Sequence, residues 1–345
     1  MSARDITVEE ERWRVCALYR FAPLPDHEAW RGRIEALCRR EGLRGTVIVA
    51  SEGINGTVAG AAQAIDSLLS LLASDTRFDD LEAKFAWATR QPFKRLNVRS
   101  KKEIVTLGRA VDPTRDAGAY VEPEDWDAVV ADPAVTVVDV RNDFEVAMGT
   151  FEGALDPRTR DFRAFPDWAA ANLPDDRDRP IAMFCTGGIR CEKSTAWLAG
   201  QGYTNLLHLH GGILAYLEKV PESSATKWRG SCFVFDERVG VGFGLEESDH
   251  TVCRSCRMPL DATDRTHEDY HAEISCPHCA PSLRPAARAR RVERLEQARR
   301  AEGRGIAHVG ADLDAERARK RAERAEQRRR SLAGHSNGRS PASVD

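Results

Sequence analysis

The sequence predicts a multidomain protein that combines an α+β domain, an α/β domain, a cysteine-rich region and a charged tail. Strand-like and helix-like segments follow the order β-α-β-β-α-β up to residue 108. Continuous β-branched runs, each followed by a helical segment, characterise residues 122–220. Glycine and cysteine replace this periodicity over residues 228–280, and Ala, Arg and Glu dominate residues 281–345. A chain of 345 residues with 42% hydrophobic residues is long enough for two or three such cores.

The first domain, residues 13–108, is expected to be a ferredoxin-like (acylphosphatase-like) sandwich. "RVCALYRF", "GTVIVA", "INGTVAG" and "EAKFAWA" are typical of strands. Trp30, Ile34 and Leu37 recur at helical spacing, and a second helix is predicted over residues 61–75. "SEGING" supplies the glycines of a turn, and we assign no chemistry to its Glu52 and Asn55.

The second domain is predicted to be a doubly wound parallel sheet. "AVTVVDVR" and "PIAMFC" have the apolar, β-branched character of buried parallel strands. Cys185 stands at the carboxyl end of the second of these, where ligands and chemistry collect in open α/β sheets. A helix is expected to begin at about Cys191.

The loop between this strand and this helix has the composition of an anion-binding loop. Its glycines let the backbone close around the Cys185 sulfur, while Arg190 and the helix N-terminus contribute positive charge. All of these favour the reactive thiolate, so we predict Cys185 and Arg190 as catalytic residues. The residues between them are expected to surround the sulfur: Thr186, Gly187, Gly188 and Ile189. A small buried hydrophobic residue is the alternative for Cys185. Cys191, included as a catalytic candidate, is either a resolving thiol or a packing residue.

Three segments of this domain resemble the rhodanese family. "CTGGIR" is similar to the active-site loop of the family. "DVRNDFEVAMGTFEGA" is similar to its "DVR…E…GHIPGA" segment, and "GYTNLLHLHGGILAY" to its closing segment. Thr150 departs from the pattern, because many rhodaneses have His there. The resemblance covers residues 122–220 and implies a reactive cysteine at position 185.

A wider set of segments resembles the oxygen-dependent tRNA uridine hydroxylases that contain a rhodanese domain. These are "SEGINGTVAG", "GALDPRTRDFRAFPDW", "CTGGIRCEKS" and "GSCFVFDERVGVG". The resemblance implies formation of 5-hydroxyuridine at the wobble position of tRNA, with molecular oxygen as co-substrate. From the residues alone, the chemistry is that of a thiolate or persulfide, either of which can attack an electrophilic pyrimidine carbon. No flavin or nicotinamide motif is present.

Two C-x2-C pairs predict a structural zinc site. Each pair directs two thiolates at one point, and four thiolates leave no open position on the metal. The expected ligands are Cys253, Cys256, Cys276 and Cys279. We expect the nearby histidines to lie outside the ligand set: His267, His271 and His278.

Basic residues cluster in two places suited to tRNA, which we expect as the partner. "RQPFKRLNVRSKK" mixes cations with an aromatic ring, and its predicted RNA contacts are Lys94, Arg95, Arg99, Lys101 and Lys102. A solvated edge strand is the alternative. Residues 281–330 carry 16 basic and eight acidic side chains, against a net charge of −3 for the whole chain. This tail is expected to be helical and then disordered, and it either binds polyanions or is a solvated helix.

A cytoplasmic protein is expected. No apolar run reaches the roughly 18 residues of a membrane span, and the acidic start "MSARDITVEEERWR" lacks signal-peptide character. The leading interpretation is the hydroxylase. A sulfurtransferase that relays persulfide sulfur through Cys185 and a non-enzymatic, zinc-stabilised RNA-binding protein are the alternatives. A simple sulfurtransferase needs neither the four-cysteine site nor the basic surface, so the extra regions favour the hydroxylase. The sequence indicates no oligomeric state.

Overall fold

The computed structural model describes residues 12–303, and the structural statements below concern that part of the chain. Its contacts separate a unit that ends at Arg284 from a second that begins at Pro285, and each is described by itself. No helix within the described range has the length and apolar character needed to cross a bilayer.

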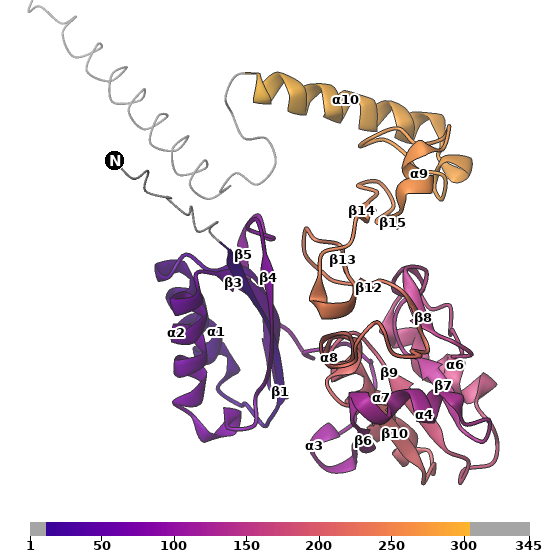
Figure 1. Cartoon of the computed structure of the whole chain (residues 1–345). Coiled ribbons are helices and arrows are strands. Elements are labelled where there is room, and N and C mark those ends of the chain that lie inside the picture. Colours follow the sequence, from indigo (N-terminus) through magenta and orange to yellow (C-terminus); the bar gives the residue numbers. More distant parts are fainter. Residues whose placement is uncertain (1–11, 304–345) are drawn as a thin grey trace, which may run out of the picture. The chain divides into compact units, whose positions relative to one another are not determined.

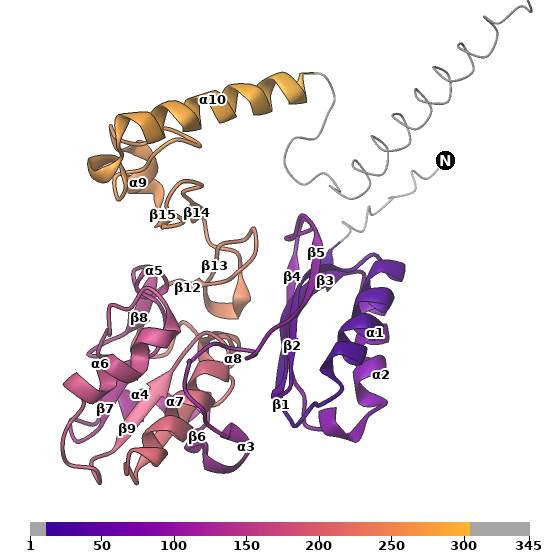
Figure 2. The ribbon, with the colours of Figure 1, turned by 180° about the vertical axis from the view of Figure 1, so that it is seen from behind.

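The N-terminal domain confirms the predicted ferredoxin-like order. Its sheet runs β4-β1-β3-β2-β5, with antiparallel pairs except for β5, which is parallel to β2. Helices α1 (His27–Arg40) and α2 (Ala62–Ala73) cover one face (Figures 1 and 2). The strands are β1 (Trp13–Phe21), β2 (Arg44–Ala50), β3 (Gly53–Gly60), β4 (Glu82–Ala88) and β5 (Leu96–Ser100).

The two faces of this sheet differ in chemistry because side chains alternate along each strand. Cys16, Leu18, Val47 and Val58 pack in the core beneath the helices. The alternate positions point away from the helices, and those that are small or polar and line a cavity are Ala17, Tyr19, Thr46, Asn55, Thr57 and Lys84. A face of this kind is open to a ligand.

The second domain contains the parallel sheet expected from its β-branched runs. Its order is β6-β10-β9-β7, and all three pairings are parallel. The strands are β6 (Ala119–Val121), β7 (Thr136–Asp139), β9 (Ile181–Phe184) and β10 (Leu206–Leu209). The helices are α3 (Pro113–Asp116), α4 (Trp126–Ala131), α5 (Asp143–Val146), α6 (Phe165–Asn172), α7 (Ile189–Gly200) and α8 (Gly212–Lys219). Helix α7 begins two residues earlier than expected, because Gly188 at its N-cap has φ 104° and turns the loop directly into the helix.

Short strand pairs connect this domain to the cysteine-rich region. β11 (Trp228–Gly230) pairs with β8 (Gly149–Phe151), and a hairpin follows. The remaining elements are β12 (Cys232–Phe233), β13 (Gly240–Val241), β14 (Thr251–Val252), β15 (Pro259–Leu260) and α9 (Ala262–Thr266). Around β14 and β15 the buried apolar residues are Leu260 and three cysteines, so this part has little core of its own.

The second unit contains α10 (Pro285–Glu302), a charged helix in the segment expected to be helical. The end of the tail, which was expected to be disordered, lies outside the described residues.

Candidate active site

The Cys185 loop is formed by close approach of backbone segments. Cys185 follows β9 directly and is fully buried. The Gly188 N–H donates to the Cys185 sulfur at 3.1 Å. From the start of α8, Gly212 packs against this loop with φ 66°, and a Cβ there would lie 2.5 Å from the Cys185 carbonyl oxygen. Glycine at position 212 therefore permits the contact that fixes the loop.

Arg190 is held beside the sulfur by a buried carboxylate that sequence reasoning did not single out. Its Nη1 and Nη2 donate to Glu145 Oε2 and Oε1 at 2.7 and 2.6 Å. Thr186 Oγ1 also donates to Glu145, at 3.1 Å. Glu145 stands on α5, six residues after the buried Asp139, which itself forms a bidentate pair with Arg141. An arginine in a buried loop needs such a counter-ion, and this requirement is the signal that could have identified Glu145.

These contacts lower the pKa of Cys185 to about 5. Burial opposes the charged thiolate, but the Cys191 thiol donates to the Cys185 sulfur, the Arg190 charge attracts it, and the N–H groups of residues 190 and 191 point at it. Burial and the neighbouring thiolate raise the pKa of Cys191, which therefore keeps its proton. These surroundings favour the thiolate form of Cys185 and the protonated form of Cys191.

Thr150, the departure from the rhodanese pattern, is accommodated by a short contact. Its hydroxyl donates to Asp139 Oδ2 at 2.8 Å. Asp139 thus keeps a partner at this position in addition to Arg141. The departure therefore leaves no buried carboxylate oxygen without a hydrogen bond at this site.

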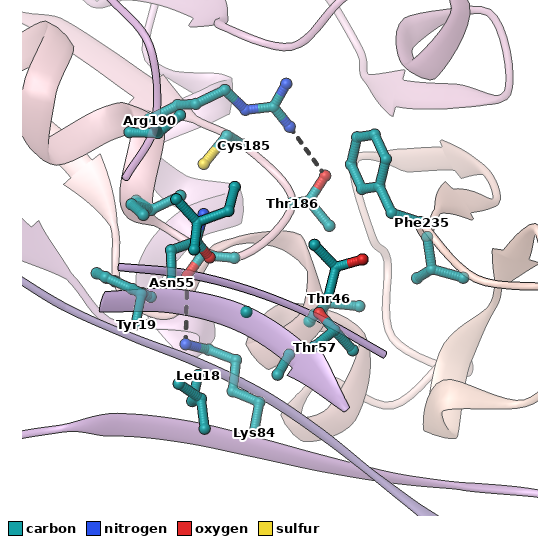
Figure 3. A pocket seen from close by; sticks show the side chains of 18 of the residues that line it. Leu18, Tyr19, Thr46, Asn55, Thr57, Lys84, Cys185, Thr186, Arg190 and Phe235 are labelled. Carbon is teal, nitrogen blue, oxygen red and sulfur yellow. Dashed lines mark hydrogen bonds between the residues drawn. The ribbon is translucent and has the colours of Figure 1, made fainter. Parts of the chain in front are cut away.

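The Cys185 loop opens onto a cavity of about 680 Å³ that is lined by several segments of the first unit. The polar face of the N-terminal sheet contributes Tyr19, Thr46, Asn55 and Thr57, the loop contributes residues 185–187, 189 and 190, and the β12–β13 hairpin contributes Phe235 (Figure 3). Cavities of about 300–1,000 Å³ are typical of small-molecule sites.

Helix α7 joins the two domains through consecutive side chains. The Tyr19 hydroxyl donates to Glu192 Oε1 at 2.7 Å. The buried Lys193 Nζ lies 2.8 Å from Glu52 Oε1 and 2.6 Å from Glu103 Oε2. Glu52 was expected to be a turn residue without chemistry, but it is part of an ion cluster that connects the domains. The local sequence held no signal for this contact, because its partners are far apart in the chain.

The predicted RNA-contact residues lie on and around β5. Arg99 is exposed on this strand, Arg95 precedes it, and Lys101 and Lys102 follow it. Lys101 also lines the cavity. Lys94 forms an ion pair with Glu237 at 3.4 Å, and none of the other four forms an ion pair within residues 12–303. Four exposed cations thus remain available at one edge of the N-terminal sheet.

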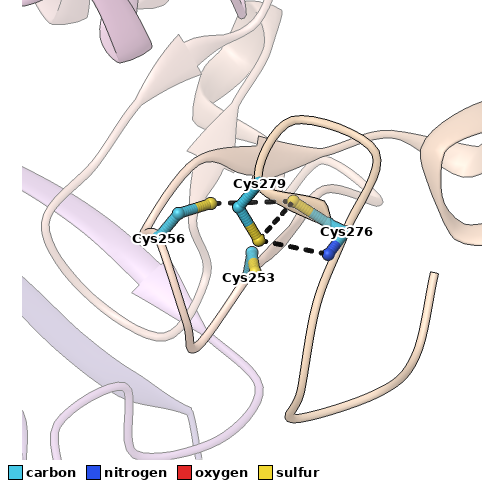
Figure 4. A group of neighbouring side chains, drawn as sticks. All are labelled: Cys253, Cys256, Cys276 and Cys279. Carbon is cyan, nitrogen blue, oxygen red and sulfur yellow. Dashed lines mark hydrogen bonds between the residues drawn. The ribbon is translucent and has the colours of Figure 1, made fainter. Parts of the chain in front are cut away.

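The four predicted metal ligands come together and could hold a metal ion (Figure 4). The sulfur atoms of Cys253, Cys256, Cys276 and Cys279 all lie within 4.8 Å of one another. Cys276 Sγ is 3.6 Å from Cys256 Sγ and 3.8 Å from Cys279 Sγ. A tetrahedral zinc site with bonds of about 2.3 Å separates its sulfurs by about 3.8 Å, so this donor set fits zinc. His278 instead contacts Asp264 at 3.0 Å.

Comparisons with known proteins relate this architecture to characterised families. Residues 13–104 match the UPF0176 acylphosphatase like domain, and residues 122–219 match the rhodanese-like domain. Curated relatives from Brucella suis and Brucella anthropi, both named tRNA uridine(34) hydroxylase, are 49% identical over 299 residues. The alignments cover 86% of this chain and 98% of each relative. A solved rhodanese-like domain from Anabaena aligns with 32% of this chain and 78% of its own, at 20% identity and a TM-score of 0.27.

Proposed function

Because the chain belongs to the tRNA uridine(34) hydroxylase family, we propose that it hydroxylates the wobble uridine of tRNA in the cavity that holds Cys185. The product is 5-hydroxyuridine, with molecular oxygen as co-substrate. One observation supports this cavity as the active site: Cys185, whose thiolate form is favoured, lines it together with the N-terminal sheet. The relatives favour this activity over sulfur relay and over RNA binding without catalysis.

Cys185 acts as the nucleophile. Uracil is electrophilic at C6, which is conjugated to the C4 carbonyl through C5. The thiolate forms an S–C6 bond, and the electron pair of the C5–C6 double bond moves toward C5 and O4. C5 becomes electron-rich and open to oxidation. Loss of the C5 proton and expulsion of the thiolate later restore the ring.

The net reaction replaces C5–H by C5–OH. One atom of molecular oxygen enters the base. A reductant supplies two electrons and two protons, which convert the other oxygen atom to water. The residues of the loop stabilise the thiolate before attack and again when it is expelled: Arg190, itself held by Glu145, through its charge, and Cys191 through its S–H. A wobble base is accessible to such a site because bases of single-stranded RNA loops can be turned out of their stack.

The remaining regions support binding and folding. We propose that the four-cysteine site binds structural zinc and stabilises a region with little apolar core. The cations around β5 contact tRNA phosphates. With tRNA as its substrate, the protein is proposed to act in the cytoplasm.

Nucleoside mass spectrometry of tRNA incubated with the purified protein under oxygen tests this function. Wild-type protein should produce 5-hydroxyuridine, and Cys185→Ser should produce none, because serine has a similar shape but its hydroxyl is far less acidic. Circular dichroism of the variant provides the folding control. Product formation by a folded Cys185→Ser protein would contradict the nucleophilic role.

A further inference from the structure

The hairpin between β12 and β13 presents an aromatic side chain at the cavity without covering it. Phe235 is 60% exposed, whereas the phenylalanines that flank it in space, Phe144 and Phe233, are more buried. Among the large apolar side chains exposed within residues 12–303, Phe235 is the one that lines the cavity. A partly exposed aromatic ring that lines the same cavity as a nucleophile is placed to contact a ligand bound there.

Two other aromatic rings pack against the Phe235 ring. Phe233 meets it edge to face at a centroid distance of 5.1 Å, and Phe144 does so at 6.5 Å. Phe144 and Phe233 also pack edge to face with each other at 5.1 Å. This aromatic cluster fixes the orientation of the Phe235 ring, so little conformational entropy is lost when a ligand stacks on it.

The backbone that carries Phe235 is fixed as well. Val234 N–H donates to the Val239 carbonyl at 2.8 Å and closes the hairpin. Arg238 Nε and Nη2 donate to Asp236 at 2.9 and 2.7 Å in a nearly buried pair, and both residues line the cavity. Glu237 N–H donates to the Pro92 carbonyl at 3.0 Å, which ties the hairpin to the segment that leads into β5.

The hairpin lies close to the segment that carries the predicted RNA contacts. Lys94 forms an ion pair with Glu237 of the hairpin, Arg95 and Arg99 are exposed, and Lys101 lines the cavity itself. In the view of Figure 3, Thr186 lies between Cys185 and Phe235. A nucleophile and an exposed aromatic ring that line one cavity, with cations nearby, suit neighbouring nucleotides, because single-stranded RNA is bound by base stacking on aromatic rings and by cations at its phosphates.

We propose that Phe235 is a substrate-contact residue on which the base of a nucleotide adjacent to uridine 34 stacks while the uridine occupies the cavity. The inference rests on the proposed function and adds the binding mode of the neighbouring nucleotide. Stacking of this base holds the anticodon loop open and leaves the chemistry to Cys185.

Steady-state kinetics on tRNA provide the first test. Phe235→Ala should raise KM about 5- to 140-fold with little change in kcat, which is the range expected for one lost base-aromatic stack. Phe235→Tyr and Phe235→Trp should restore KM, whereas Phe235→Leu should not. Trp87→Ala is the matched control, because Trp87 is 52% exposed but does not line the cavity. An unchanged KM for Phe235→Ala, full function of Phe235→Leu, or an equal rise for Trp87→Ala would overturn the proposal.

A binding measurement separates this inference from the proposed function. An anticodon stem-loop carries 2-aminopurine on the 5′ or the 3′ side of uridine 34. Stacking on Phe235 should change the probe fluorescence for one of the two positions, both with wild-type protein and with Cys185→Ser. The change should be absent with Phe235→Leu. A normal response without any hydroxylated product would refute the proposed function alone, and an unaltered response with Phe235→Leu would refute the stacking alone.

Discussion

The Cys185 sulfur carries its charge without exposure to bulk solvent, and this requires several donors that can be removed separately. A pKa of about 5 lies far below the ordinary thiol value of 9.0. The thiolate is therefore present above about pH 5, and protonation removes the nucleophile only below that value. Alkylation of Cys185 should follow the same curve, since the thiolate is the reactive form.

Changes at position 191 test the hydrogen bond that Cys185 accepts. Cys191→Ala should move the midpoint of Cys185 alkylation upward by about one to two pH units, because a hydrogen bond to a charged group is worth about 1.5–3 kcal/mol. Cys191→Ser should shift it less, because its hydroxyl can still donate. The rate of iodoacetamide modification against pH, with the adduct located by mass spectrometry, gives the midpoints. Identical midpoints for the alanine variant and wild type would mean that Cys191 only packs.

Glu192 should make the free energy of unfolding fall as the pH rises. Burial raises its pKa from 4.5 to about 6, although hydrogen bonds from Tyr19 and Tyr120 partly offset this. The folded state thus favours the protonated form, so its contribution is complete below about pH 4.5 and is lost as the pH rises through 6. The difference amounts to about 2 kcal/mol. Glu192→Gln should remove this part of the pH dependence of urea unfolding, whereas parallel curves for variant and wild type would refute it.

At the scale of elements, the first turns of α7 serve both domains at once. Arg190 and Cys191 orient the thiolate, while Glu192 and Lys193 bind the N-terminal sheet and its neighbouring segment. Loss of the domain contact should therefore disturb the helix that positions the nucleophile. The same helix therefore supplies residues to the catalytic loop and to the domain interface.

Lys193→Met tests this coupling. Removal of the ammonium leaves Glu52 and Glu103 close together without their counter-ion, which should lower the free energy of unfolding by about 3 kcal/mol. Lys219→Met is the control: Lys219 is exposed and lies 3.4 Å from Glu122, so its loss should cost less than about 1 kcal/mol. Thermal and urea unfolding give both values. Equal effects of the two substitutions would show that the buried cluster does not stabilise the domain contact.

The spacing of apolar residues predicted the helices and strands, because it follows which side of each element is buried. Leu18 and Val47 belong to short runs rich in apolar and β-branched or aromatic residues, and these runs predicted the strands of the first sheet. The glycines around Cys185 located the loop, since close backbone approach requires them. The contact of Tyr19 with Glu192 spans 173 residues, and neither local sequence carries a mark of the other. Phe235 was missed for a related reason: nothing near it in the sequence distinguishes an exposed ring from a buried one.

At the scale of the whole molecule, metal should hold the cysteine-rich region together. We expect about one zinc per chain, and we expect chelation to unfold residues 251–282 before the rest, because metal binding there contributes directly to folding free energy. Metal analysis gives the stoichiometry, and hydrogen exchange locates the opening. Protein purified without chelator that contains no metal, or uniform opening of the chain after chelation, would contradict this.

The two basic regions should have separable effects on tRNA. Removal of residues 285–345 should weaken tRNA binding and flatten its salt dependence, with each lost phosphate contact lowering the log-log slope by about 0.7–0.9. Modification at saturating tRNA should persist. Joint replacement of Lys94, Arg95 and Arg99 by alanine should instead impair modification. The reverse pattern in binding titrations and product assays would show that the roles of the two regions are exchanged.

The cluster of Lys193 with Glu52 and Glu103 also constrains how this protein can diverge. Its members come from both domains, so neither domain can change its part alone without leaving an uncompensated charge at their boundary. Positions 52, 103 and 193 should therefore vary together among natural relatives. A relative that lacks a cation at position 193 should also have lost at least one of the two carboxylates, and a chimera that joins domains from two such lineages should fold poorly until the third partner is restored.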